Sequence, residues 1–411
     1  MRSNDPYGII ELGNISLKCI IFTVDENNNS KILSTSISKS EGIYNGTIVN
    51  LTKASSSIRS CISAAEKEAK VSLKKISIVI EQPEFLCTKF SKKRKINGAK
   101  IHKDDIEFLL KEAKKEAQVN DAKHSIIHIF NHNYIVDGKI FIEEPIDIFA
   151  DYLSHEMTFV TMPKNNIKNI KQAFIDCDIE VERIISCVFA LAANLLKNYE
   201  LQHGSILIDI GYEKISLGLF KNLALVHSIT LPLGINHITK DISKVCSLSL
   251  KESENIKNNI DFSFEENIEL FDEKKYLKEI YFVESKYRKI SSSLVENIAK
   301  ARIDEILEIV KKQITITGLS TISGTNIFIV GGGSKLLKLE KYCSSFFGFN
   351  VNKLSDYEKK QNKIIYQDDF SSCFGALKII KDGWETEAIP QPSSEQNKKL
   401  NFFSKIFRLK L

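Results

Sequence analysis

The sequence predicts an α/β protein built from two related halves. An apolar run, Tyr7 to Gly13, ends in acid–apolar–glycine and turns into a second apolar run, Leu17 to Phe22. The same pattern returns at Ile206 to Gly211, which is followed by Ile215 to Phe220. A third strand-like run, 326–330, leads into three consecutive glycines. Two hairpins of one design, one in each half, indicate an internal duplication.

Length and composition limit the class of protein. A chain of 411 residues is expected to form two or more domains. A net charge of +5 argues against nucleic-acid binding by the molecule as a whole. The eight cysteines include no C-x-x-C pair, which predicts reduced, buried thiols in a cytoplasmic protein. We expect no signal peptide and no membrane-spanning segment, because no apolar run approaches the required length of about 20 residues.

The two hairpins predict a phosphate-binding site. Converging backbone N–H groups hold anions well, and the turn glycines Gly13 and Gly211 leave the backbone free to present them. Each hairpin has a carboxylate at the end of its first strand, Glu11 in one and Asp209 in the other. Such carboxylates can position the water molecules of a Mg²⁺ ion, and Asp209 is the predicted indirect metal contact.

The glycine cluster Gly331, Gly332 and Gly333, with Ser334 after it, is a second predicted nucleotide contact. Three glycines after a strand let a nucleoside lie flat against the backbone. A flexible turn is the alternative interpretation. A helix is expected to follow over residues 335–342.

Two charged motifs have a functional and a structural interpretation. Glu254 and Lys257 stand at i and i+3 of a predicted helix, where they share one face. They either clasp the ribose and base of a nucleotide or form an ordinary surface ion pair. The basic run 92–95 is interpreted as a solvated loop or strand edge rather than as a nucleic-acid site.

The C-terminal segment predicts a membrane-binding helix behind a flexible linker. Residues 386–400 contain Pro, Ser and Gln and lack core-forming content. On a helix over 401–411, apolar side chains form one stripe and basic side chains oppose it, which is typical of binding at a membrane surface. Docking into a groove of a partner protein is the alternative. The predicted membrane-binding residues are Phe402, Phe403, Lys405, Ile406, Phe407, Arg408, Leu409 and Lys410.

Several further stretches, together with both hairpins and the terminal helix, make the chain resemble the FtsA family of actin-like bacterial division proteins over essentially its whole length. These stretches are 40–50 (SEGIYNGTIVN), 137–146 (DGKIFIEEPI), 232–242 (PLGINHITKDI), 253–257 (SENIK) and 301–307 (ARIDEIL). The resemblance implies an actin-like, duplicated RNase H-like fold with four subdomains. The implied boundaries are 1–83 and 164–195 for subdomain 1A, 84–163 for 1C, 196–240 and 315–385 for 2A, and 241–314 for 2B.

The resemblance also implies a function. ATP with Mg²⁺ would be the cofactor, and the protein would be a scaffold rather than an enzyme. Its implied partners are the tubulin-like ring protein FtsZ, bound mainly through 241–314, further copies of itself in protofilaments, later division proteins and anionic inner-membrane lipids. No nucleic acid is expected. The implied location is the cytoplasmic face of the inner membrane at the division site.

The sequence departs from the family pattern at the phosphate loops. The family's second loop continues with small residues and Thr, whereas Tyr212, Glu213 and Lys214 follow Gly211 here. In the first loop Asn14 stands where Thr or Ser is usual, and Lys18 is the candidate for the expected lysine. Asn14, Lys18 and Tyr212 complete the predicted nucleotide-binding residues, and these departures predict binding with weak hydrolysis at most. The alternatives are a sugar kinase or Hsp70-type ATPase and an actin-like adaptor of a pilus-assembly machine.

Overall fold

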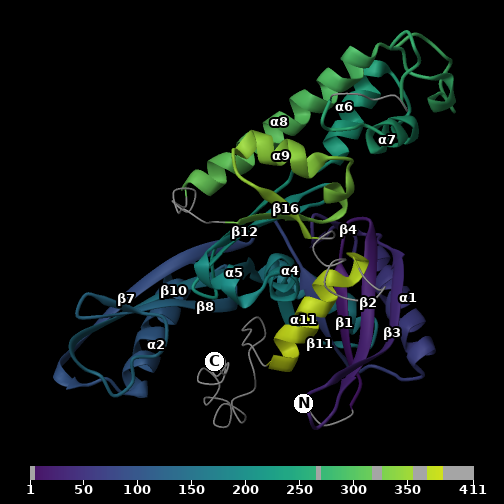
Figure 1. Cartoon of the computed structure of the whole chain (residues 1–411). Helices are drawn as coiled ribbons and strands as arrows, with labels where there is room; N and C mark the ends of the chain where they lie inside the picture. The colour runs from purple at the N-terminus through teal and green to yellow at the C-terminus, as the bar shows by residue number, and fades with distance from the viewer. Residues whose placement is uncertain (1–4, 265–269, 317–325, 355–367, 383–411) are drawn as a thin grey trace. The chain divides into compact units, whose positions relative to one another are not determined.

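The computed structural model describes residues 5–264, 270–316, 326–354 and 368–382 (Figure 1). The chain divides into two compact units. The first comprises Met1–His203, Gly218–Ile229 and Ile365–Leu411, and the second comprises Gly204–Leu217 and Thr230–Ile364. The predicted linker 386–400 and amphipathic helix 401–411 lie outside the described residues.

A mixed five-stranded sheet forms the centre of the first unit, in the order β11-β6-β1-β2-β3. Its strands are β1 (Tyr7–Leu12), β2 (Ser16–Val24), β3 (Ser30–Lys39), β6 (Lys75–Ile80) and β11 (Glu180–Ser186), and the short strands β4 (Ile43–Tyr44) and β5 (Thr47–Ile48) pair separately. β1 pairs antiparallel with β2 and parallel with β6. This arrangement confirms the predicted first hairpin.

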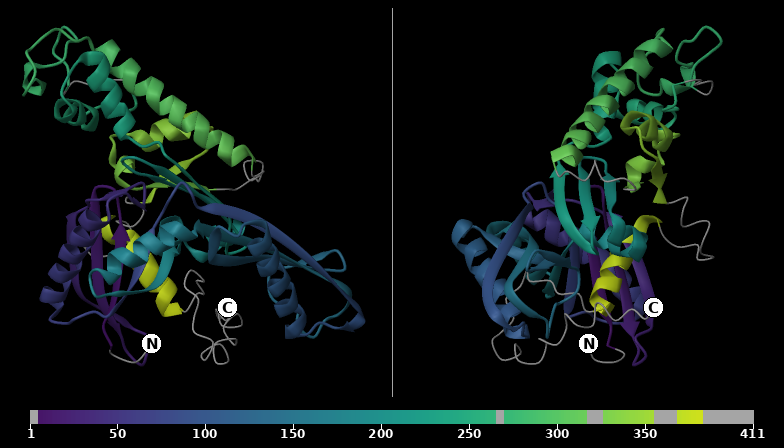
Figure 2. Two further views of the ribbon diagram at one scale, coloured as in Figure 1. Left: turned by 180° about the vertical axis from the view of Figure 1, so that it is seen from behind. Right: turned by 60° about the vertical axis from the view of Figure 1, so that its left-hand side comes forward.

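Helices bury the apolar side chains of this sheet. α1 packs against β2 and β3, while α11 packs against α4 and β1. Figure 2 shows α11, in yellow, beside the purple strands from the other end of the sequence. These contacts agree with the division of the chain, which places α11 in the first unit. The helices of this unit outside the inserted sheet are α1 (Leu51–Ala69), α3 (Lys164–Ile175), α4 (Cys187–Leu195), α5 (Asn198–His203) and α11 (Ser371–Asp382), preceded by a 3₁₀ turn, η4 (Asp368–Phe370).

A separate four-stranded antiparallel sheet lies between β6 and α3 in the sequence, in the order β7-β10-β8-β9. Its elements are β7 (Leu86–Lys100), α2 (Lys103–Asn120), β8 (His124–Val136), β9 (Lys139–Phe141) and β10 (Phe149–Pro163). α2 packs on one face of β7 and β10 (Figure 1), where its Ile106 and Leu109 join a buried cluster with Ile96 and Leu153. The inserted segment therefore has its own small core.

The second large sheet repeats the plan of the first, with the order β14-β13-β12-β15-β16. Its strands are β12 (Ser205–Ile210), β13 (Ile215–Lys221), β14 (Ala224–Leu231), β15 (Asn326–Val330) and β16 (Val351–Lys353). β15 runs parallel to both β12 and β16, as β6 does to β1 and β11. In each sheet the hairpin strands lie on one side and two parallel strands on the other. This shared topology is what the predicted duplication requires.

The helices of the second unit include three that pack together, because α6 contacts both α7 and α8. The elements are α6 (Asn236–Cys246), α7 (Leu250–Asn258), α8 (Ser292–Ile316) and α9 (Leu339–Phe347), with 3₁₀ turns η1 (Glu279–Tyr281) and η3 (Gly332–Lys335). The prediction of a helix over 335–342 is wrong about where the helix begins. A 3₁₀ turn comes first, and α9 begins at Leu339. Among the described helices, none is long and apolar enough to cross a membrane.

Candidate nucleotide-binding site

The two predicted phosphate turns share one backbone design. A side chain at Gly13 would place its Cβ 2.5 Å from the carbonyl oxygen of Ser16, and one at Gly211 would lie 2.7 Å from that of Lys214. In the second turn the Gly211 N–H donates to this same Lys214 oxygen at 2.9 Å. Both positions therefore need glycine because the chain returns closely over itself three residues later.

In the first hairpin the polar side chains bind one another. Lys18 Nζ lies 3.3 Å from Glu11 Oε2, and Ser372 Oγ donates to that same oxygen at 2.5 Å. Burial alone would lower the pKa of Lys18, but the Glu11 carboxylate, together with neighbouring groups, outweighs burial and raises it. Asn14 Nδ2 donates to Asn45 Oδ1 at 3.0 Å. Lys18 is therefore held as a charged ion pair with Glu11.

In the second hairpin the unusual loop residues are anchored to α6. The Glu213 carboxylate accepts a hydrogen bond from Asn236 Nδ2 at 2.6 Å and pairs with Lys240 Nζ at 3.2 Å. The loop backbone is held to the same helix, because the Asn236 N–H donates to the Tyr212 carbonyl at 2.9 Å. The loop is thereby fixed to the start of α6, with the Glu213 carboxylate beside the turn.

Glu254 and Lys257 form the ion pair that their spacing predicts, but its lysine is buried while the Glu254 side chain is 33% exposed. Lys257 Nζ lies 2.7 Å from Glu254 Oε1, its side chain is 0% exposed, and it stands 5.6 Å from the centroid of the Tyr212 ring. Thr239 Oγ1 donates to Glu254 Oε2 at 2.6 Å. Burial lowers the pKa of Lys257, and the Glu254 carboxylate opposes that shift without cancelling it.

The glycine turn is crowded at two of its three glycines and open at the third. Gly331 has a φ of +86°, and a Cβ there would lie 2.2 Å from Asp209 Oδ1. A Cβ on Gly333 would meet Ile210 at 2.3 Å, whereas one on Gly332 would meet nothing within 4 Å. Ser334 Oγ donates to the Gly331 carbonyl at 2.7 Å, which closes the turn. The backbone at Gly332 is consequently the part of the turn with room beside it.

Within the second unit, two contacts join predicted residues in pairs. The Gly331 turn lies against Asp209, and Tyr212 lies beside Lys257. Sequence reasoning missed Glu213, Asn236, Lys240 and Thr239 as supporting residues, because their partners are distant in sequence. In the first unit it missed Ser372 and Asn45 for the same reason.

The backbone beside Gly332 is open, and Glu254, with a side chain 33% exposed, is the accessible member of its pair with Lys257. These are the groups of the second unit that could contact a nucleoside. The Glu213 carboxylate opposes a polyphosphate, although Lys240 neutralises part of its charge. Among the described residues there is no cluster of three or more histidine, cysteine, aspartate or glutamate side chains arranged to hold a metal ion.

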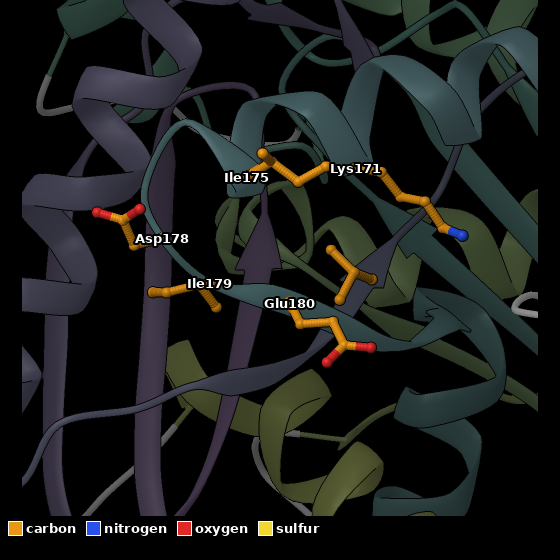
Figure 3. A pocket seen from close by; sticks show the side chains of 6 residues that line it. Lys171, Ile175, Asp178, Ile179 and Glu180 are labelled. Carbon is orange, nitrogen blue, oxygen red and sulfur yellow. The ribbon is translucent and has the colours of Figure 1, made fainter.

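A pocket elsewhere in the first unit does not involve the predicted residues (Figure 3). It has a volume of about 310 Å³ and lies where the end of α3 meets β11. Its lining mixes aliphatic side chains with one lysine and two carboxylates: Lys171, Ile175, Asp178, Ile179, Glu180 and Val181. Figure 3 shows the Lys171 amine and the Asp178 carboxylate pointing apart, so the polar groups do not converge on one ligand.

Comparison with known proteins identifies the class. Among solved structures, a chain of the PilM-PilN type IV pilus biogenesis complex is similar with a TM-score of 0.63 and 13% identity, covering 92% of this chain and 98% of that one. MreB5 of Spiroplasma citri bound to AMPPNP gives a TM-score of 0.53 at 13% identity and covers 92% and 97%. The duplicated sheets, the two glycine turns and these likenesses define an actin-like protein.

Sequence comparisons identify the family. The family model for the cell division protein FtsA matches residues 206–375, and the model for the SHS2 domain inserted in FtsA matches 85–161. FtsA of Agrobacterium fabrum is 23% identical over 84% of this chain and 79% of its own length. FtsA of Buchnera aphidicola subsp. Acyrthosiphon pisum is 25% identical over 97% and 95%. The chain belongs to the FtsA family of cell division proteins, and the inserted sheet β7–β10 is its SHS2 domain.

Proposed function

We propose that this protein tethers FtsZ polymers to the cytoplasmic face of the inner membrane at the division site. Its membership of the FtsA family supports a role in division. The observation that carries the tether is the sequence after Glu395, where basic and apolar residues are interspersed and no acid occurs. Such a segment binds an anionic bilayer through its apolar face and its cations together.

The expected strength of this anchor favours a protein that assembles. The five basic residues contribute roughly 1 kcal/mol each near an anionic leaflet. Part of that gain is offset by the cost of ordering a short helix. One copy therefore binds reversibly, whereas many copies on one polymer bind strongly through effective concentration. Self-assembly into protofilaments is accordingly part of the proposal.

The adaptor role also needs a binding site for each further partner and for the nucleotide. FtsZ is proposed to bind the helical part of the second unit, residues 241–314, and later division proteins are the remaining proposed partners. ATP, with Mg²⁺, is proposed to bind at Glu11, Gly13, Asn14, Lys18, Asp209, Gly211, Tyr212, Glu254, Lys257, Gly331, Gly332, Gly333 and Ser334. The carboxylate of Glu213, anchored beside the second turn, supports binding with weak hydrolysis. Rapid steady ATP turnover by the purified protein would instead favour an ATPase.

Vesicle co-sedimentation tests the tether. The intact protein should sediment with vesicles containing anionic lipid and not with neutral vesicles. Deletion of 398–411 should abolish this, and Phe403→Glu with Phe407→Glu should do the same by placing two charges in the apolar stripe. Ser393→Glu with Ser394→Glu is the matched control, because it makes the same charge change in the linker. Undiminished sedimentation of the deletion variant would refute the membrane role.

A second candidate is an adaptor of a pilus-assembly machine. The structural likeness to the chain from the PilM-PilN complex favours it, whereas the FtsA family matches favour the division role. A pull-down with purified FtsZ separates the two. Retention of FtsZ by the intact protein on the beads supports the division role. Failure of the folded protein to retain FtsZ supports the alternative.

A further inference from the structure

The edge strand of the inserted SHS2 sheet carries charges of one sign only. β7 (Leu86–Lys100) is the outermost strand in the order β7-β10-β8-β9, and β10 is its one partner among the described strands. Alternate backbone N–H and C=O groups of such an edge strand face away from the sheet. The strand contains no acidic residue and six basic ones: Lys89, Lys92, Lys93, Arg94, Lys95 and Lys100.

The basic side chains of β7 divide between the two faces of the sheet. Lys92 and Arg94 point towards α2, where they pair with Glu116 and Asp105 respectively. Phe90, on the same face, packs against α2 in a buried cluster. The charges on the helix-covered face are therefore already neutralised inside the domain.

Lys93 and Lys95 lie on the opposite face and are exposed. Lys93 Nζ stands 4.1 Å from the centroid of the Tyr152 ring, and Tyr152 is itself 40% exposed and opposite Lys95 in the strand register. Within the described part of the chain, the carboxylate ion pairs of β7 are those of Lys92, Arg94 and Lys100. Lys93 and Lys95 therefore offer two cations, two residues apart, beside a backbone edge.

We propose that the β7 edge binds an extended acidic segment of a partner protein as an added strand. The partner's backbone pairs with the outward N–H and C=O groups of Ser91–Lys95, and carboxylates at alternate positions of the partner face Lys93 and Lys95. In strand addition, main-chain hydrogen bonds supply affinity while side chains on one face supply specificity. This surface is distinct from the residues proposed for nucleotide, FtsZ and membrane binding, so it is an additional partner site.

Charge determines which strand the edge accepts. A second copy of β7 would bring two uniformly basic strands together, and like charges on neighbouring strands oppose pairing. An acidic strand gains opposite-charge pairs at the same positions. A nucleic acid would be attracted by the charges but has no backbone that matches the spacing of the strand groups. The combination of lysines and a strand edge thus favours an acidic peptide.

Fluorescence anisotropy with a labelled synthetic peptide tests the proposal on the full-length protein. The peptide alternates glutamate with valine and threonine. It should bind, and Lys93→Glu with Lys95→Glu should weaken binding by ~10-fold or more, because attractive cross-strand pairs become repulsive. Lys111→Glu with Lys115→Glu is the matched control, since both residues are exposed on α2 of the same domain. Its peptide affinity should change little.

Backbone methylation of the peptide separates strand addition from simple charge attraction. N-methyl groups on the N–H groups that face β7 should abolish binding, whereas methyl groups on the alternate, outward N–H groups should leave it intact. Equal binding of both methylated peptides, or of a peptide with its glutamates gathered at one end, would overturn the proposal. So would no binding of the peptide, or stronger binding of duplex DNA or anionic vesicles that depends on Lys93 and Lys95.

Discussion

The two hairpins of this protein have the same turn but different surroundings. In both, a glycine lies against the carbonyl oxygen of the residue three positions on. Around the first turn, Glu11 forms an ion pair with Lys18 and accepts a hydrogen bond from Ser372, all within the first unit. Around the second, Glu213 is held by α6. Duplication thus preserved the backbone geometry, while the side chains of each copy acquired separate partners.

The paired lysines near the two hairpins differ in the direction of their pKa shifts. Lys18 is 20% exposed and Lys257 is fully buried, and each is paired with a glutamate. The pKa of Lys18 is raised because Glu11 and neighbouring groups together outweigh burial, whereas the pKa of Lys257 is lowered because burial outweighs Glu254. Lys18 is therefore a permanent structural cation, and Lys257 is the cation whose charge a change of pH removes first.

Removing the partner of Lys18 should have the largest effect. Glu11→Ala leaves a mostly buried amine without its carboxylate, which should lower the free energy of unfolding by about 3 kcal/mol in urea titrations. The double variant Glu11→Ala with Lys18→Met removes the buried charge as well and should regain most of this loss. Equal destabilisation of the single and double variants would show that the ion pair does not hold the first hairpin.

The open glycine of the second unit provides the next test. Gly332→Asp should weaken ATP binding by ~10-fold or more, because it places a carboxylate beside the proposed nucleotide position. No atom lies within 4 Å of the added Cβ, so the thermal midpoint of unfolding should barely change. Gly332→Ala is the control and should retain binding. Unchanged ATP affinity of Gly332→Asp in a fluorescent-nucleotide titration would show that ATP does not bind beside Gly332.

The smallest predicted effect is a pH dependence. Because the pKa of Lys257 is lowered, its amine loses its proton at a lower pH than an ordinary lysine as pH rises. Nucleotide affinity should therefore fall by about 10-fold between pH ~7 and the usual lysine range near pH ~10. Lys257→Met should bind more weakly and remove this part of the slope. An unchanged slope in the variant would assign the titration to another group.

Local patterns predicted much of the fold and one ion pair of the candidate site. Both hairpins, the glycine turn and the Glu254–Lys257 pair depend on residues close in sequence, where strand alternation and helical spacing are decisive. The bond from Ser372 to Glu11 spans 361 residues, and no local pattern indicates it. The burial of Lys257 was equally hidden, because i, i+3 spacing gives a shared face but not what packs over it.

A flotation experiment tests the central claim most directly. FtsZ polymers are mixed with anionic vesicles and either the intact protein or the variant lacking 398–411, and the vesicles are then floated through a density gradient. The account predicts that FtsZ floats with the vesicles when the intact protein is present and stays at the bottom with the truncated one. Flotation of FtsZ with the truncated protein, or its absence with the intact one, would contradict the proposed tether.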